Sequence, residues 1–270
     1  MNISDKTTKN DIWIIILFSL SLLIMIVLSL VDITIFDNQL ANEMFTNSIS
    51  RFIGGVVLVV ILCLLGYKAL FKFNTPLIKT LLIVLPGLLI AVNNFPIIAY
   101  FDNRAAITEP TYTIYLFIVE CISIGFFEEV VFRGLILIFL LQRFSNTKKG
   151  MYKAIILSSA LFGLIHIANL FSGAGFGNTM LQIGYSFLMS MMWAVVYLKT
   201  RNIWYSVFLH AAYNFFGLVL FRLGYVNARY DDITLTLTAL LALTAVVYMA
   251  FESYKINPKK LQTFITATEE

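Results

Sequence analysis

The sequence predicts an all-α, polytopic integral membrane protein with about eight transmembrane helices and both termini in the cytoplasm. The first observation is composition. Of the 270 residues, 60% are hydrophobic and 13% are charged, and the mean hydropathy of +0.87 is far above that of water-soluble domains. The second is that several apolar runs approach the roughly 20 residues that cross a bilayer. The third is that these runs are continuous rather than alternating, which favours helices over a barrel.

Short polar or glycine-containing segments separate the apolar runs and mark turns between helices. The first run is too long for a signal-peptide core and no small-residue cleavage pattern follows it, so we expect it to be retained. The third span contains Pro86 and Pro96, and we expect a kink there. The expected spans cover residues 12–35, 52–71, 77–99, 113–142, 152–171, 179–199, 203–223 and 233–252.

The basic residues alternate between loops as this arrangement requires. With the amino terminus inside, 14 of the 19 Lys and Arg residues fall on the cytoplasmic side. Those on the outer side are Arg51, Arg104, Arg222 and Arg229. The net charge of +4 therefore reflects topology, and we expect the lipid bilayer, with anionic lipid at its inner face, as a partner rather than nucleic acid.

The chain is expected to form one membrane domain over residues 1–270. Its functional motifs fall within residues 113–223. Residues 1–11 and 254–270 are expected to be short cytoplasmic tails.

One basic residue, Arg133, falls inside the fourth span, in the stretch "FFEEVVFRG". A charged group at the centre of a spanning helix costs about 2.5–3.5 kcal/mol, so this cluster needs compensation. Glu129 and Arg133 lie one helical turn apart and are expected to pair. Glu128 points about 100° away around the helix. It is therefore the carboxylate left over for another partner or for chemistry.

Both histidines of the chain also lie inside expected spans. His166 closes "FGLIH" in the fifth span, and His210 opens "HAAYN" in the seventh, with Asn214 one turn further on the same face. Intramembrane histidines commonly serve as interhelical hydrogen-bonding groups, which is the structural alternative. Two histidines at a depth similar to an acidic pair favour a shared site.

These groups are sufficient to hydrolyse a peptide bond with water as the nucleophile. Glu128 would act as general base, and His166 would hold or activate the water. His210 and Asn214 would donate hydrogen bonds to the developing oxyanion or orient the carbonyl. A zinc version stays open, with His166 and His210 as ligands and Glu128 as third ligand or base. The short HExxH signature is absent from the sequence.

The three motifs carry a resemblance to a known family. "EEVVFR", "FGLIH" and "HAAYN" match EExxxR, FxxxH and HxxxN in the order typical of the CPBP family. That family comprises type II CAAX prenyl endopeptidases and bacteriocin-processing or immunity (Abi-type) proteins. The resemblance implies an intramembrane endopeptidase, described in the family as a metalloprotease or as using a metal-free, glutamate-activated water. The catalytic groups it implies are Glu128, Glu129, Arg133, His166, His210 and Asn214.

The resemblance leaves the substrate open among a CAAX-like protein, a bacteriocin and a signalling peptide. The Ile, Leu, Lys and Asn richness of the chain favours a bacterial plasma membrane. We therefore expect a membrane-embedded or amphipathic peptide as substrate. Two alternatives from other classes are a non-catalytic immunity or adaptor protein of the same fold and a proton-coupled transporter.

Overall fold

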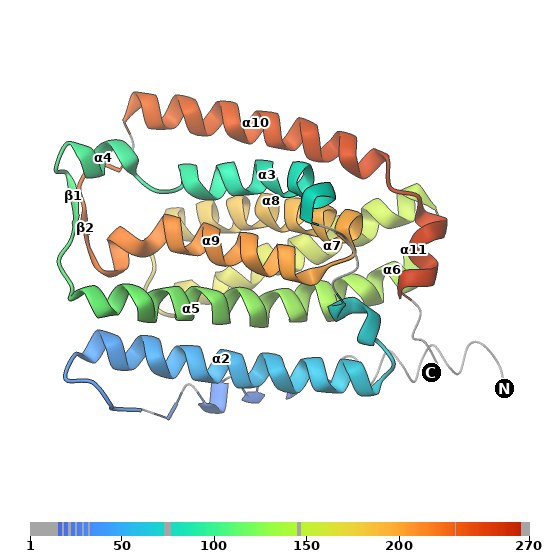
Figure 1. Cartoon of the computed structure of the whole chain (residues 1–270), viewed down its shortest axis with the longest axis horizontal. Coiled ribbons are helices and arrows are strands. Elements are labelled where there is room, and N and C mark those ends of the chain that lie inside the picture. Colours follow the sequence, from blue (N-terminus) through green and yellow to red (C-terminus); the bar gives the residue numbers. More distant parts are fainter. Residues whose placement is uncertain are drawn as a thin grey trace.

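Helices make up most of the described chain and run side by side along its long axis (Figure 1). The computed structural model describes residues 33–72, 77–144, 147–229 and 231–265, together with residues 16, 17, 19, 20, 23, 24, 26–28, 30 and 31. Ten of the 24 residues of the first expected span, 12–35, therefore lie outside the described residues. In chain order the elements are α2 (Gln39–Leu64), the 3₁₀ helix η1 (Lys68–Phe71), α3 (Leu77–Asn93), α4 (Ile97–Phe101), β1 (Ala105–Ile107), α5 (Thr111–Glu129), the π-helix η2 (Val130–Leu137), α6 (Ile138–Phe144), α7 (Lys148–Leu164), the 3₁₀ helix η3 (Ile165–Leu170), α8 (Phe176–Thr200), α9 (Ile203–Arg222), β2 (Gly224–Val226), α10 (Asp232–Tyr254) and α11 (Pro258–Ile265).

Several of these helices have the length and composition of membrane spans. Within the described ranges, five helical stretches qualify, and Thr80–Asn93 is a shorter apolar helix. The five are Gln39–Leu64, Lys148–Leu170, Phe176–Thr200, Ile203–Arg222 and Asp232–Tyr254. The chain is therefore an all-α, multi-pass membrane protein. The number of about eight spans, the orientation in the membrane and the single domain stay predictions.

The sequence prediction placed the start of the second span too far along the chain. The sequence prediction placed its beginning at residue 52, whereas α2 begins at Gln39, after Asn38 accepts a hydrogen bond from the Ala41 amide at 2.9 Å. The polar residues that favoured a loop have partners inside the bundle. Ser48 Oγ donates to the Met44 carbonyl at 2.6 Å, and Asn47 Nδ2 donates to Glu120 Oε1 of α5 at 3.0 Å.

The third and fourth predicted spans contain interruptions. The expected kink in the third is a break, because α3 ends at Asn93 and Pro96 precedes the short α4. The fourth is one continuous helical segment from Thr111 to Phe144, in which the π-helix η2 separates α5 from α6.

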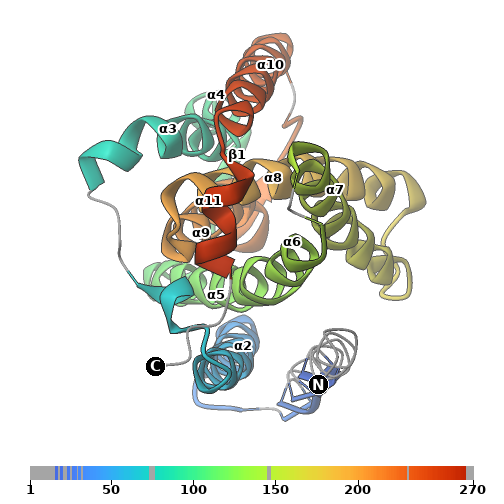
Figure 2. The same ribbon diagram turned by 90° about the vertical axis from the view of Figure 1, so that its right-hand side faces the viewer.

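The site region lies where α8 and α9 meet the junction between α5 and η2. α5 packs between α2 and α9, and α9 also contacts α3 and α8. Viewed along the bundle, α9 lies near the middle and α10 at the periphery (Figure 2). The largest buried apolar cluster includes side chains of α5, η2, α8 and α9. Residues in the middle of α5 and α9 are therefore shielded by neighbouring helices.

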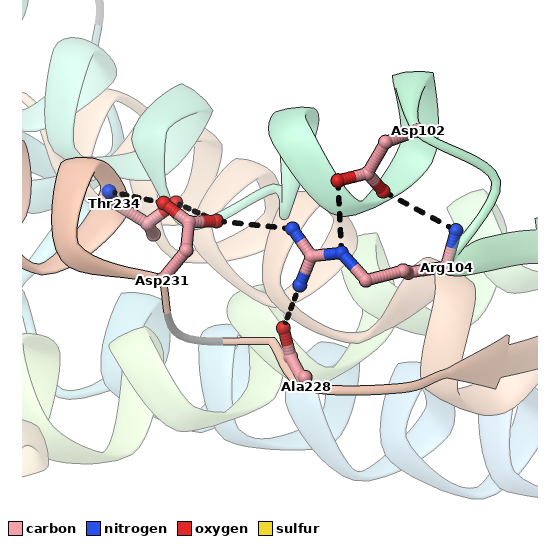
Figure 3. A network of polar contacts seen from close by, with 5 residues as sticks. All are labelled: Asp102, Arg104, Ala228, Asp231 and Thr234. Atoms are coloured by element: carbon pink, nitrogen blue, oxygen red, sulfur yellow. Dashed lines mark hydrogen bonds and ion pairs between the residues drawn. The ribbon is translucent and has the colours of Figure 1, made fainter.

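One end of the bundle is held together by a small two-stranded antiparallel sheet and an arginine. β1 pairs antiparallel with β2, and the adjacent Arg104 reaches three groups (Figure 3). Its Nε is 2.8 Å from Asp102 Oδ2, a second nitrogen is 3.3 Å from Asp231 Oδ2, and a third donates to the carbonyl of Ala228. Asp231 also caps α10, accepting from the Thr234 amide at 2.8 Å. This cluster, Asp102, Arg104, Ala228 and Asp231, is called the terminal arginine network below.

Candidate active site

The three sequence motifs come from elements that meet inside the bundle. Glu128 and Glu129 are the last residues of α5, and Arg133 follows in η2. His210 lies on α9, and Asn214 is one turn further along it. The sixth residue, His166, lies in η3. The structure thus brings the first, second and third motifs to one region.

The close approach of α5 and α9 depends on Gly125. A Cβ atom at this position would lie 2.9 Å from the Val207 carbonyl oxygen and 3.1 Å from the Ala211 amide nitrogen of α9. Only glycine leaves room for the α9 backbone there. Because Gly125 is one turn before Glu129 and Ala211 adjoins His210, this contact sets the distance between the two motifs.

The predicted pair of Glu129 and Arg133 is confirmed. The two side chains are fully buried, and an Arg133 Nη1 to Glu129 Oε1 distance of 3.0 Å makes an ion pair. The other terminal nitrogen of Arg133 donates to the Ser190 carbonyl at 3.0 Å and to Ser190 Oγ at 2.9 Å. The guanidinium also lies over the rings of Phe162 and Trp193, at 5.2 and 5.5 Å from their centroids. The buried charge is therefore compensated from several sides.

Glu129 has a second partner that the sequence prediction missed. Oε1 of Glu129 lies 2.9 Å from His210 Nδ1. A carboxylate paired with an arginine accepts hydrogen bonds, so Nδ1 of His210 carries the proton. The imidazole also stacks on Trp193, with ring centroids 4.4 Å apart. Glu129 and Trp193 together fix the position and the ring plane of His210.

Glu128 differs from its neighbour in exposure and in partners. Its side chain is 26% exposed, whereas that of Glu129 is 0% exposed. Oε2 of Glu128 lies 3.7 Å from His210 Nε2, which is too long for a hydrogen bond. The leftover carboxylate of the sequence prediction is thus accessible and faces the imidazole that Glu129 holds.

His166 and Asn214 complete the surroundings without touching the ion pair. Both side chains are half-buried. The imidazole of His166 packs edge-on against Phe162 at 5.7 Å, lies within electrostatic range of Glu128 and His210, and has Nδ1 3.3 Å from Gln182 Nε2. The side-chain amide of Asn214 makes no hydrogen bond to any residue that the structure describes. Its amide is therefore available to a ligand.

Other parts of the site carried no clear signal in the sequence. The π-helix η2 begins directly after Glu129, and such segments often occur at functional sites. Ser190 and Trp193 of α8 belong to none of the three motifs. Phe162 did carry a signal, because it opens the "FGLIH" motif and its ring touches both His166 and His210.

The predicted zinc ligands do not form a ready-made metal site. Among the described residues, no group of three or more His, Cys, Asp or Glu side chains is arranged to hold a metal ion. Glu128 and His210 face one another, but His166 does not join them as a third ligand. Zinc binding stays a prediction, and no step proposed below depends on it.

Fold and site together define a class: a multi-pass helical membrane protein with an accessible glutamate, a supporting Glu–Arg pair and two histidines inside its bundle. Residues 110–216 match the family described as Type II CAAX prenyl endopeptidase Rce1-like. This stretch contains all three motifs, and the match confirms the family predicted from them. The match supports an assignment, in general class, to intramembrane proteases of the CAAX type. A search of the curated proteins and a search of the solved structures gave no match.

Proposed function

We propose that this protein hydrolyses a peptide bond of a membrane-embedded or amphipathic substrate with a water molecule that Glu128 activates. The observation that carries the proposal is the division between the two glutamates. Glu129 is fully buried and engaged by Arg133 and His210, whereas Glu128 is partly exposed and faces the second nitrogen of His210. A general base must reach water, and of these two carboxylates only Glu128 is accessible.

The proposed reaction transfers one proton in two steps. Glu128 removes a proton from water as the water oxygen bonds to the scissile carbonyl carbon, which gives a tetrahedral oxyanion. The carbon–nitrogen bond then breaks, and the same proton passes to the leaving nitrogen. His210 Nε2, 3.7 Å from Glu128 Oε2, is close enough to share this proton after a small side-chain movement.

The other motif residues have supporting roles in this proposal. Asn214 has an unengaged amide one turn from His210 and would donate to the oxyanion or to the substrate carbonyl. Glu129 holds His210 in place, and Arg133 pairs with Glu129. His166, on the neighbouring η3, would contact the same water or oxyanion.

The substrate class follows from the family and from the setting of the site. The matched family supports a CAAX-like carboxyl-terminal segment of a lipid-modified protein. The sequence composition favours a bacterial plasma membrane. In that membrane, a bacteriocin or a signalling peptide is the alternative substrate. A site inside a helical bundle suits a substrate already held at the membrane.

The decisive experiment measures cleavage by the purified protein in lipid nanodiscs. Candidate peptides with and without a prenyl group are offered to the native protein, Glu128→Ala and His166→Ala, each with and without a metal chelator. Glu43→Ala is the matched control, because Glu43 is an exposed glutamate that pairs with Arg222 away from the site.

We expect native and Glu43→Ala cleavage to agree and both site variants to lose cleavage. Loss of native cleavage on chelation would support the zinc mechanism, and resistance would favour the metal-free one. Equal cleavage by Glu128→Ala and the native protein would refute the proposed role. A native protein that cuts none of the peptides would favour the immunity or adaptor alternative, and proton flux that requires Glu128 in vesicles would favour transport.

A further inference from the structure

The corner between η3 and α8 holds a short hydrogen-bond chain that ends on His166. Asn169 Nδ2 donates to Gln182 Oε1 at 2.8 Å, and Gln182 Nε2 lies 3.3 Å from His166 Nδ1. Neither Asn169 nor Gln182 belongs to the three sequence motifs. The three hydrogen-bonded residues lie on consecutive elements of the fold. Asn169 lies three residues after His166 in η3, and Gln182 lies in the second turn of α8.

The direction of this chain determines which ring nitrogen carries the proton. The Gln182 oxygen already accepts from Asn169, so the amide presents its NH₂ group to His166. An NH₂ group can only donate, and therefore Nδ1 of His166 must accept. In the neutral imidazole the proton is then on Nε2, the nitrogen left for the site.

His210 is held in the opposite way. Its Nδ1 faces the carboxylate of Glu129, which can only accept, so Nδ1 carries the proton and Nε2 faces Glu128 without one. The two histidines of the chain thus present opposite faces to the same region: His166 a donor, His210 an acceptor.

We infer that Gln182, oriented by Asn169, is a positioning residue that makes His166 a hydrogen-bond donor through Nε2–H. In this role His166 donates to the water oxygen or to the oxyanion, and it neither removes a proton nor binds a metal through Nε2. Histidines that bind metals usually donate their other N–H to a carboxylate or carbonyl, whereas His166 accepts at that position. The inference rests on the proposed function and specifies one role within it.

The first test measures the tautomer of His166 and needs no substrate. Nitrogen-15 NMR of histidine-labelled protein in nanodiscs contains signals from two imidazoles only, and His210→Asn leaves the signals of His166. We expect the native His166 to be protonated at Nε2 and not at Nδ1. A proton on Nδ1 and none on Nε2 would overturn the inference.

Two substitutions test the chain itself. In Gln182→Glu a carboxylate replaces the donor, so the proton of His166 should move to Nδ1. Asn169→Asp should do the same from one residue further away, because an aspartate would accept from the Gln182 NH₂ group and turn the Gln182 oxygen toward His166. Gln142→Glu is the matched control, because Gln142 lies on α6 and donates a hydrogen bond to the Tyr67 hydroxyl.

Cleavage provides the second readout. If His166 donates only in the transition state, Gln182→Glu and Asn169→Asp should each lower kcat by about 100-fold with little change in KM. Gln142→Glu should leave both constants unchanged. A purely structural role would lower the amount of folded protein without moving the NMR signals of His166.

The two proposals fail separately. An NMR signal of Nδ1–H in native His166, together with cleavage that depends on Glu128, would reject the donor role and keep the protease proposal. The expected tautomer in a protein that cuts none of the peptides would reject the protease proposal and keep the hydrogen-bond chain. Unchanged kcat in both variants despite a moved proton would also reject the donor role.

Discussion

Two arginines of this protein each bind carboxylates, but they do so in contrasting surroundings. Arg133 is fully buried in the middle of the bundle, and Glu129 and Ser190 bind it there. Arg104, in the terminal arginine network, is 29% exposed and lies between Asp102, which is 46% exposed, and Asp231 (Figure 3). Arginine–carboxylate pairing thus occurs both in the interior and at an end of the helices.

The contrast teaches that burial, more than pairing, decides what such a network does. In the interior, loss of one partner leaves a charge that water cannot reach, which is strongly destabilising. At an exposed end, water and salt replace a lost partner, and the effect is small. We therefore expect the interior pair to contribute far more to stability than the terminal arginine network.

The largest effect is expected from Arg133→Met. This change leaves Glu129 buried without its counter-charge, and breaking a buried pair in this way costs about 3–5 kcal/mol. We expect a large drop in thermal stability in detergent micelles. The double variant Arg133→Met with Glu129→Gln removes both charges and should recover part of the loss. A double variant less stable than the single one would show that the pair is not the source of the effect.

A smaller effect is expected from Gly125→Ala. The added methyl group would lie 2.9 Å from the Val207 carbonyl oxygen and push α5 from α9, which typically costs about 1–3 kcal/mol. Cleavage should fall as well, because His210 moves relative to Glu129. Gly134→Ala, in the same continuous helical segment, is the control, since its nearest neighbour would be at 3.5 Å. Equal stability and cleavage of the two variants would contradict the role of Gly125.

Arg104→Gln should destabilise the protein less than Arg133→Met or Gly125→Ala. Its partners are partly exposed, and water can replace the lost contacts. We expect thermal stability close to that of the native protein and unchanged cleavage. A loss as large as that of Arg133→Met would break the comparison between the two arginines.

The smallest effect is a dependence on acid pH. The hydrogen bond from the Thr234 amide, with further bonds from the Thr234 hydroxyl and Arg104, lowers the pKa of Asp231 from its usual value. A lowered folded-state pKa gives stability that is fully present above the unfolded pKa of about 3.9 and is lost as the pH falls through the folded value. As the pH falls from about 6 to 3, the melting temperature should therefore decrease less steeply for Asp231→Asn than for the native protein. Parallel curves would exclude this contribution.

Much of the fold followed from hydrophobic runs, because a bilayer requires long apolar helices with few polar residues. Hydrophobic runs do not predict helical segments whose polar residues are buried in protein. Residues 39–51 of α2 were interpreted as a loop, since the bonds from Ser48 to Met44 and from Asn47 to Glu120 cannot be read from composition. The π-helix η2 was missed because its backbone geometry has no clear pattern of residue types.

The site was predicted to the extent that it follows from spacing within a helix. Glu129 and Arg133 are one turn apart, so their pairing needed no tertiary information. The bond from His210 to Glu129 and the chain from Asn169 through Gln182 to His166 join different elements. Such contacts depend on how helices pack, and a single sequence does not specify them.

The central claim is that two adjacent glutamates divide the work, with Glu129 supporting the fold and His210 and with Glu128 reacting. The most direct test measures thermal unfolding and peptide cleavage of Glu128→Gln and Glu129→Gln side by side. We expect Glu128→Gln to unfold like the native protein while cleavage falls by about 100-fold or more, and Glu129→Gln to lose stability and cleavage together. Native-like cleavage by Glu128→Gln, with Glu129→Gln stable but inactive, would contradict the claim.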